Sequence, residues 1–259
     1  MSIWLTLAAV AVLASITLVI VVALRLEHPW LQPWAIARAT VQLAILTVIL
    51  AGVISDPRWV ATFLVVMVLA ATWVVYRRLL LPRRYIPVIA GIIIAAAAVP
   101  TFAIFLTGAV DFSPRYVLAV GGIIIGNAMT VSTLMGRSLT TLITSLRDEI
   151  EAWLSVGATA RVAARRAVRS AASTALIPST DQTRTTGIVT LPGAFVGAVF
   201  AGASPIVAAE FQLLVLAGIL AAGAITVALF TLAFGAPQVL PLGESPLGGR
   251  AVPVLRHNP

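Results

Sequence analysis

The stretch IPVIAGIIIAAAAVPTFAIFL, Ile86 to Leu106, decides the class of this protein, because it holds no charged residue over a length that crosses a bilayer. A transmembrane helix needs about 20 mostly apolar residues, and other runs of the chain reach that length. The 259 residues have a mean hydropathy of +1.06 and 10% are charged, against about 25% in a soluble domain. The sequence therefore predicts an all-α integral membrane protein.

About seven transmembrane helices are predicted from these apolar runs. They cover Ile3–Leu24, Ala35–Ile54, Trp59–Tyr76, Ile86–Leu106, Tyr116–Met135, Thr185–Ala203 and Val207–Phe234. Residues 1–234 form the predicted transmembrane domain, and a cytoplasmic segment at 136–184 interrupts it between spans five and six. Residues 235–259 are rich in proline and glycine, which predicts a flexible cytoplasmic tail.

The arginines orient the predicted bundle. With the N-terminus outside and the C-terminus in the cytoplasm, fifteen of the seventeen arginines lie in cytoplasmic segments, and Arg58 and Arg115 lie outside. This asymmetry is the one that the positive-inside rule expects. The net charge of +8 therefore results from arginines at the cytoplasmic side of the lipid bilayer, which is the predicted partner. No basic, aromatic-rich soluble surface is predicted, so we expect no nucleic-acid partner.

The polar stretch EAWLSVGATARVAARRAVRSA, Glu151 to Ala171, lies in the cytoplasmic segment. Gly157 is suited to end a helix, because glycine adopts the left-handed conformation without steric cost. Thr159 can cap a following helix through its hydroxyl. The stretch thus predicts helix, tight turn, helix, and such a protruding knob favours a socket on a partner. Arg161, Arg165 and Arg169 share one helical face, which is typical of a solvated surface near anionic lipid headgroups.

The turn resembles the coupling loop of ABC-transporter permeases, in which Glu-Ala-Ala is followed three residues later by glycine. Glu151, Ala152 and Gly157 keep that spacing, whereas Trp153 replaces the second alanine. More of the chain resembles the FetB-type (YbbM-type) family of ABC permeases, bacterial iron exporters with plant relatives associated with aluminium tolerance. The matching segments are RATVQL (38–43), GNAM (126–129), LSVGAT (154–159) and ALIPSTDQTRTTGIVTLPGAFVGAVFAGASP (175–205).

This resemblance implies a permease of the bacterial inner (plasma) membrane that exports iron or another metal ion. It implies a homodimer that works with two copies of a separate ATPase subunit, to which ATP and Mg are bound. ATP-driven closure of the ATPase would then push on the turn. The residues expected to couple the two subunits are Glu151, Leu154, Ser155, Gly157, Ala158 and Thr159.

Polar side chains within spans are the candidates for a substrate path. They are Gln42, Asn127, Met129, Thr130, Thr133 and Gln212. For each of them a hydrogen bond between helices is the alternative. The predicted spans place no carboxylate in mid-membrane, because Asp181 and Glu210 lie near span ends, and both histidines lie outside the spans. Metal binding is therefore implied by the resemblance and has no predicted ligand set.

Two small-xxx-small patterns predict close helix packing, either within a subunit, at a dimer interface or along a pore. They are Gly122 with Gly126, and Gly193 with Gly197. Pro178 and Pro192 are expected to break or kink helices where the cytoplasmic segment meets the membrane.

The chain is not expected to be an enzyme or to bind a cofactor itself. A Walker A loop requires a lysine, and the chain has none. One alternative within transport is export of a lipid or nucleotide-sugar. Alternatives of another class are an ATPase-independent carrier or channel and a membrane scaffold. A carrier usually has an ionisable residue in mid-membrane, and none is predicted here.

Overall fold

The computed structural model describes residues 2–26, 28–53 and 56–237, and within these ranges the chain is built from helices. It divides into one unit up to residue 55 and a larger unit from residue 56. The helices are α1 (Ile3–Ala23), α2 (Leu31–Val53), α3 (Pro57–Leu79), the 3-10 turn η1 (Arg83–Tyr85), α4 (Ile86–Leu106), α5 (Pro114–Ser145), α6 (Arg147–Ser155), α7 (Ala160–Ala163), α8 (Arg165–Thr185), α9 (Gly193–Phe200) and α10 (Pro205–Phe234).

The smaller unit is a helical hairpin of α1 packed on α2. Its connection uses a left-handed residue, Arg25, at a φ of 51°, and the chain turns back within a few residues. Both helices match predicted spans one and two, except that Ile54 lies outside the described residues.

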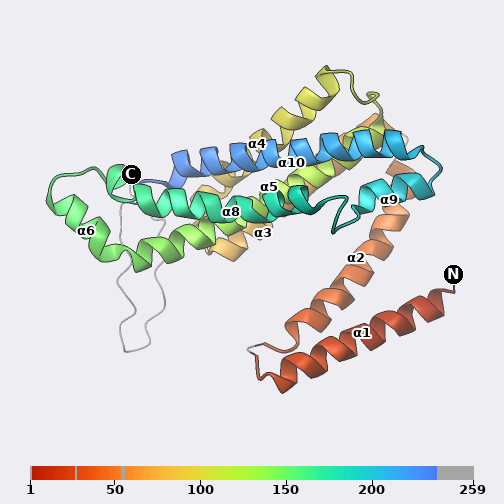
Figure 1. Ribbon diagram of the computed structural model, residues 1–259, viewed down its shortest axis with the longest axis horizontal. Helices are drawn as coiled ribbons and strands as arrows, with labels where there is room; N and C mark the ends of the chain where they lie inside the picture. Colours follow the sequence, from red (N-terminus) through yellow and green to blue (C-terminus); the bar gives the residue numbers. More distant parts are fainter. Residues whose placement is uncertain (1, 27, 54–55, 238–259) are drawn as a thin grey trace. The chain divides into compact units, whose positions relative to one another are not determined.

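The larger unit is a bundle around α5, which packs against α3, α4, α8 and α10. Figure 1 shows α5, α8 and α10 running alongside one another. The buried face of α5 is apolar, and Val120, Ile124, Met135 and Leu139 are all fully buried on it. In a membrane bundle such a stripe stabilises the core through van der Waals packing against the neighbouring helices.

Side-chain caps mark where these helices begin, and aromatic contacts between their ends show in which directions they run. Ser113 caps α5 by accepting from the backbone N–H of Tyr116. The rings of Tyr116 and Phe211 lie 5.5 Å apart at the N-terminal ends of α5 and α10. Those of Tyr85 and Phe234 lie 5.4 Å apart where α4 begins and α10 ends. Helices α5 and α10 therefore run parallel, and α4 runs antiparallel to both.

Five of the helices that the structure describes are long and apolar enough to cross a membrane: α1, α3, α4 with η1, α5 and α10. This confirms the prediction of an all-α integral membrane protein. The predicted tail at 235–259 lies outside the described residues beyond residue 237.

The prediction of one continuous sixth span at Thr185–Ala203 is wrong. Residues 186–192 form an irregular turn with Gly187 at a φ of 85°, and α9 contributes eight residues. Eight residues extend about 12 Å, which is less than half of the roughly 30 Å hydrocarbon core. The helix before the turn, α8, was predicted to be cytoplasmic, yet it packs along both α5 and α10. The sixth crossing is thus a broken helix made of α8, the turn and α9.

Candidate functional site

A sharp turn joins α6 to α7, as the sequence predicts. Gly157 adopts a φ of 86°, and its N–H donates to the carbonyl of Leu154 at 3.0 Å. The N–H of Ala158 donates to the carbonyl of Trp153, also at 3.0 Å. Thr159 then caps α7 by accepting from the N–H of Val162. The backbone groups at the end of α6 and at the start of α7 therefore find their hydrogen-bond partners within the turn. We call this protruding turn between α6 and α7 the knob.

The knob is exposed and partly apolar. Trp153, Leu154, Val156 and Val162 are exposed large apolar side chains around it. The predicted coupling residues Glu151, Ser155, Gly157 and Thr159 are also exposed, and Ala158 is half-buried. Exposed apolar side chains clustered on a protruding turn are typical of a protein interaction surface.

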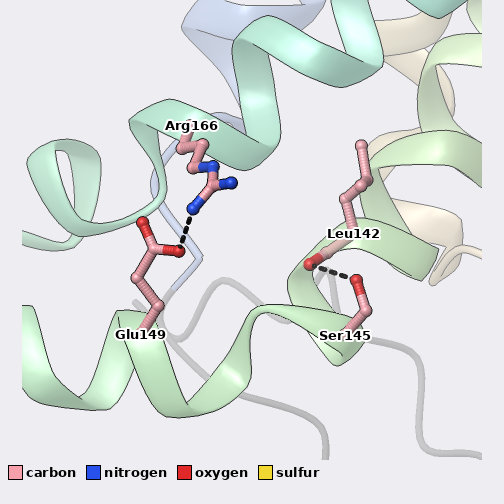
Figure 2. Close-up of polar contacts among 4 residues, drawn as sticks. All are labelled: Leu142, Ser145, Glu149 and Arg166. Atoms are coloured by element: carbon pink, nitrogen blue, oxygen red, sulfur yellow. Dashed lines mark hydrogen bonds and ion pairs between the residues drawn. The ribbon is translucent and has the colours of Figure 1, made fainter.

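The N-terminal part of α6 contacts α8 (Figure 2). The carboxylate of Glu149 on α6 accepts a charge-assisted hydrogen bond of 2.7 Å from Arg166 on α8. Behind this pair, Ile150 is buried in the same apolar cluster as Ala167 of α8. The pair itself is solvent-exposed and contributes little to stability, so the burial of Ile150 is the firmer link.

The end of α5 is tied to the start of α6. Ser145 Oγ donates to the carbonyl of Leu142 at 3.2 Å, as Figure 2 shows, and the N–H of Leu146 donates to the same carbonyl. On α6, Arg147 and Glu151 form an i, i+4 ion pair at 2.6 Å. The knob is therefore continuous with two long helices of the bundle, α5 on one side and α8 on the other.

A pocket of about 610 Å³ lies between α6 and the start of α8. Trp153 forms part of its wall, together with the ion pair of Glu149 and Arg166 and with Arg165 and Arg169. The same pocket continues to Ser170 and Ser173 further along α8. The arginine face predicted from the sequence therefore borders a hollow as well as open solvent. Arg161 departs from this group, because its guanidinium donates to the carbonyl of Leu232 at 3.4 Å.

Asn127 joins three helices. Its Nδ2 donates to the carbonyl of Ile219 on α10 at 3.0 Å, and its Oδ1 accepts from Ser179 Oγ on α8 at 3.0 Å. Of its two predicted roles, this geometry favours the hydrogen bond between helices. The contact also fixes the depth of α8, because Asn127 and Ile219 both lie near the middle of their helices.

The other candidate path residues are spread over the bundle. Thr130 is exposed on α5, whereas Thr133 is buried, and each donates its hydroxyl to the carbonyl four residues earlier. Met129 packs against the core cluster. Gln42 is exposed on α2 in the smaller unit.

Gln212 lies at the break in the sixth crossing. Its side chain is 6% exposed, and its Oε1 has no hydrogen-bond partner among the described residues. A pocket of about 300 Å³ opens beside it, bounded by the turn residues Thr186 and Gly187 and by Phe195 of α9. A buried hydrogen-bond acceptor without a partner is rare in proteins. The Oε1 of Gln212 is such an acceptor on the wall of this pocket.

The predicted glycine patterns are partly used for packing. Gly122 lies against Met67 of α3, whereas Gly126, Gly193 and Gly197 have no other side chain nearby. Four other glycines of the bundle make closer approaches that the spacing rule did not find: Gly121 against Leu64, Gly136 against Leu79, Gly218 against Ile124 and Ile104, and Gly223 against Leu176.

The two prolines lie in different settings, and Pro192 is at a break between helices, as expected. Pro192 is the N-cap of α9 and ends the irregular turn. Pro178 lies inside α8, which continues through it to Thr185. The next residue, Ser179, meets Asn127 near the middle of α5, so Pro178 lies beside the bundle.

No group of three metal-ligating side chains gathers in the described ranges. Asp181, which was predicted to lie near a span end, belongs to a helix that meets α5 near its middle. Asp181 follows Ser179 by two residues and is exposed on α8.

The sequence profile of the Uncharacterised protein family (UPF0014) matches residues 4–237, which include every helix described above. The chain belongs to the UPF0014 family. Its similarity to the UPF0014 membrane protein STAR2 of Oryza sativa subsp. japonica is 33% identity over 204 residues, covering 76% of this chain and 70% of that protein. The family relationship confirms the resemblance seen in the sequence.

Two further relatives are similar to this chain over about 70% of its length. The chain is 33% identical over 188 residues to the Probable iron export permease protein FetB of Escherichia coli (strain K12), which covers 70% of this chain and 71% of that protein. It is 30% identical over 189 residues to the Protein ALUMINUM SENSITIVE 3 of Arabidopsis thaliana, at 71% and 68% coverage. No solved structure matches this UPF0014 chain.

Proposed function

We propose that this chain is the membrane permease subunit of an ABC-type exporter, with iron or another metal ion as cargo. Two copies of the chain would work with two copies of a separate ATPase subunit, which binds the ATP and Mg. The cargo and the direction of transport rest on the similarity to the protein named as a probable iron export permease.

The observation that carries the ATPase partnership is the exposed knob between α6 and α7. Its backbone is fixed by Gly157 and Thr159, and its surface offers apolar side chains to a socket. Motion applied there reaches α5 and α8 directly, because α6 follows α5 and is held to α8 through Ile150 and Glu149. Helix α8 belongs to the broken crossing, so a push on the knob is passed to that crossing.

The partnership is tested by affinity purification from detergent-solubilised bacterial membranes. We expect an ATPase subunit to co-purify with the tagged permease, in equal numbers of copies, and its ATPase rate to rise in the reconstituted complex. An ATPase-independent carrier or a scaffold would purify without one. A carboxylate beside the middle of α5, that of Asp181, weakens the sequence argument against a carrier, and this experiment distinguishes the two classes.

The proposed orientation places the N-terminus outside and the knob in the cytoplasm. The chain contains no cysteine, so single cysteines report topology directly. Asp111 and Ser145 are exposed and lie at opposite ends of α5. A membrane-impermeant maleimide added to intact cells is expected to label Asp111→Cys and to leave Ser145→Cys unlabelled until the cells are opened. The reverse pattern would contradict the orientation and place the knob outside.

A further inference from the structure

Helix α8 is a polar helix at membrane depth. The hydrogen bond from Ser179 to Asn127 places its C-terminal half beside the middle of α5. Leu176 of α8 lies against the position of Gly223 on α10, which confirms the same depth from a second helix. At the other end, the bond from Arg161 to the carbonyl of Leu232 sets the start of this segment at the C-terminal end of α10.

Two contrasting faces run along α8. The buried face consists of small residues at four-residue spacing, Ala167, Ala171, Ala175 and Ser179, each at most 5% exposed. The opposite face is exposed and mostly polar, and its residues include Arg166, Arg169, Ser170, Ser173, Thr174, Asp181, Gln182 and Arg184, with the apolar Ile177 and Pro178 among them. Small residues let α8 approach α5 and α10 closely, and this close packing turns the polar face away from them.

This polar face is unsuited to lipid. A charged side chain at the centre of a bilayer is energetically costly unless water or a partner compensates it. Thr174 limits its own cost by donating to the carbonyl of Ser170 at 2.9 Å. Asp181 has no such compensation, because the ion pairs of the described chain do not include it. A carboxylate at this depth requires water or a cation beside it.

A pocket lies beside each end of α8. Ser170 and Ser173 line the pocket of about 610 Å³ that begins at the knob. The pocket of about 300 Å³ lies at the far end, where Thr186 ends the helix and Gln212 presents its unpartnered Oε1. In transport proteins, irregular backbone at membrane depth is tolerated where it lines a cavity.

We propose that the exposed face of α8 lines a water-filled cargo path, and that Asp181 is the carboxylate that a divalent cation meets along it. The location of the cargo rests on the proposed transport function. The oxygen ligands that this face offers to a cation are its hydroxyls, the amide of Gln182 and the carboxylate of Asp181, and its arginines lie towards the two ends of the helix. A path of single oxygen ligands binds a cation weakly, which allows the cation to leave again.

Cysteine accessibility in inside-out membrane vesicles of the full complex tests the path. The probes are Ser173→Cys, Thr174→Cys and Asp181→Cys on the polar face. Leu69→Cys, exposed on apolar α3, and Ala175→Cys, buried on α8, are the controls. An impermeant maleimide is expected to label the three probes about tenfold faster than the controls, because a thiol outside water forms the reactive thiolate less readily. Equal rates for probes and controls would overturn the proposal, whether lipid or protein covers the face.

The role of Asp181 is tested by export of ferrous iron from cells. We expect Asp181→Asn to lose most export, Asp181→Glu to keep it, and Asp111→Asn, an exposed carboxylate in the α4–α5 loop, to match the unsubstituted protein. Export by Asp181→Asn at the unsubstituted rate would overturn the assignment of Asp181. Accessibility does not depend on the cargo. Rapid labelling without iron export by the unsubstituted chain would therefore reject iron as the cargo and leave the water-filled path standing.

Discussion

Gly157→Val is expected to lower both export and permease-stimulated ATPase activity about tenfold. The left-handed φ of 86° at Gly157 suits glycine, whereas an L-residue there costs about 1–2 kcal/mol and a β-branched one is disfavoured further. Since about 1.4 kcal/mol is a factor of ten in an equilibrium, the fraction of knobs in the docking conformation should fall by that amount. The measurement is the ATPase rate of the reconstituted complex, with and without the permease variant.

The matched control is Gly108→Val. Gly108 also has a positive φ, 68°, and open space around its Cβ position, but it lies between α4 and α5 at the opposite end of the bundle. The strain of the two substitutions is similar, so only a specific role of the knob separates their effects. Equal loss in both variants, or full activity in Gly157→Val, would contradict docking through this turn.

Local chemistry explains why the knob could be predicted from the sequence. A glycine that ends a helix and a threonine that caps the next one act within a few residues of each other. The structure shows both, at Gly157 and Thr159. The long apolar runs were also predicted correctly as α3, α4, α5 and α10, because uninterrupted hydropathy needs no knowledge of neighbours.

The broken sixth crossing could not be predicted from local sequence signals and hydropathy alone. The run after Thr185 is apolar enough to imitate a span, yet Gly187 and Pro192 interrupt it. Helix α8 is polar on one face, so hydropathy assigned it to the cytoplasm. Its four-residue repeat of small buried residues was the available signal, and it indicates a helix packed closely on others.

The partners of Asn127 were beyond the reach of sequence patterns for another reason. Ser179 and Ile219 lie 52 and 92 residues further along the chain. A polar residue in a span indicates that a partner exists, but the fold decides which one. The depth of Asp181 depended on the same contact, so one unpredictable hydrogen bond determined where the candidate path lies.

Asn127→Leu is expected to destabilise the purified complex by about 1–2 kcal/mol, the range measured for hydrogen bonds between membrane helices. Leucine cannot donate to the carbonyl of Ile219 or accept from Ser179 Oγ, so both groups lose a partner inside the bundle. Export should fall in proportion to the amount of folded complex. The measurements are the thermal unfolding midpoint and the iron export of the same preparation.

Two further variants separate this role from a place on the path. Thr130→Val is the matched control, because Thr130 is exposed on the same helix and bonds only within it, to the carbonyl of Gly126; its stability should be nearly unchanged. In the Asn127→Leu background, Ser179→Ala removes the hydroxyl that has lost its acceptor and should cost less than Ser179→Ala alone. Such coupling is the signature of a direct contact. Lost export with an unchanged unfolding midpoint in Asn127→Leu would instead place Asn127 on the path, and α5 would then share the lining with α8.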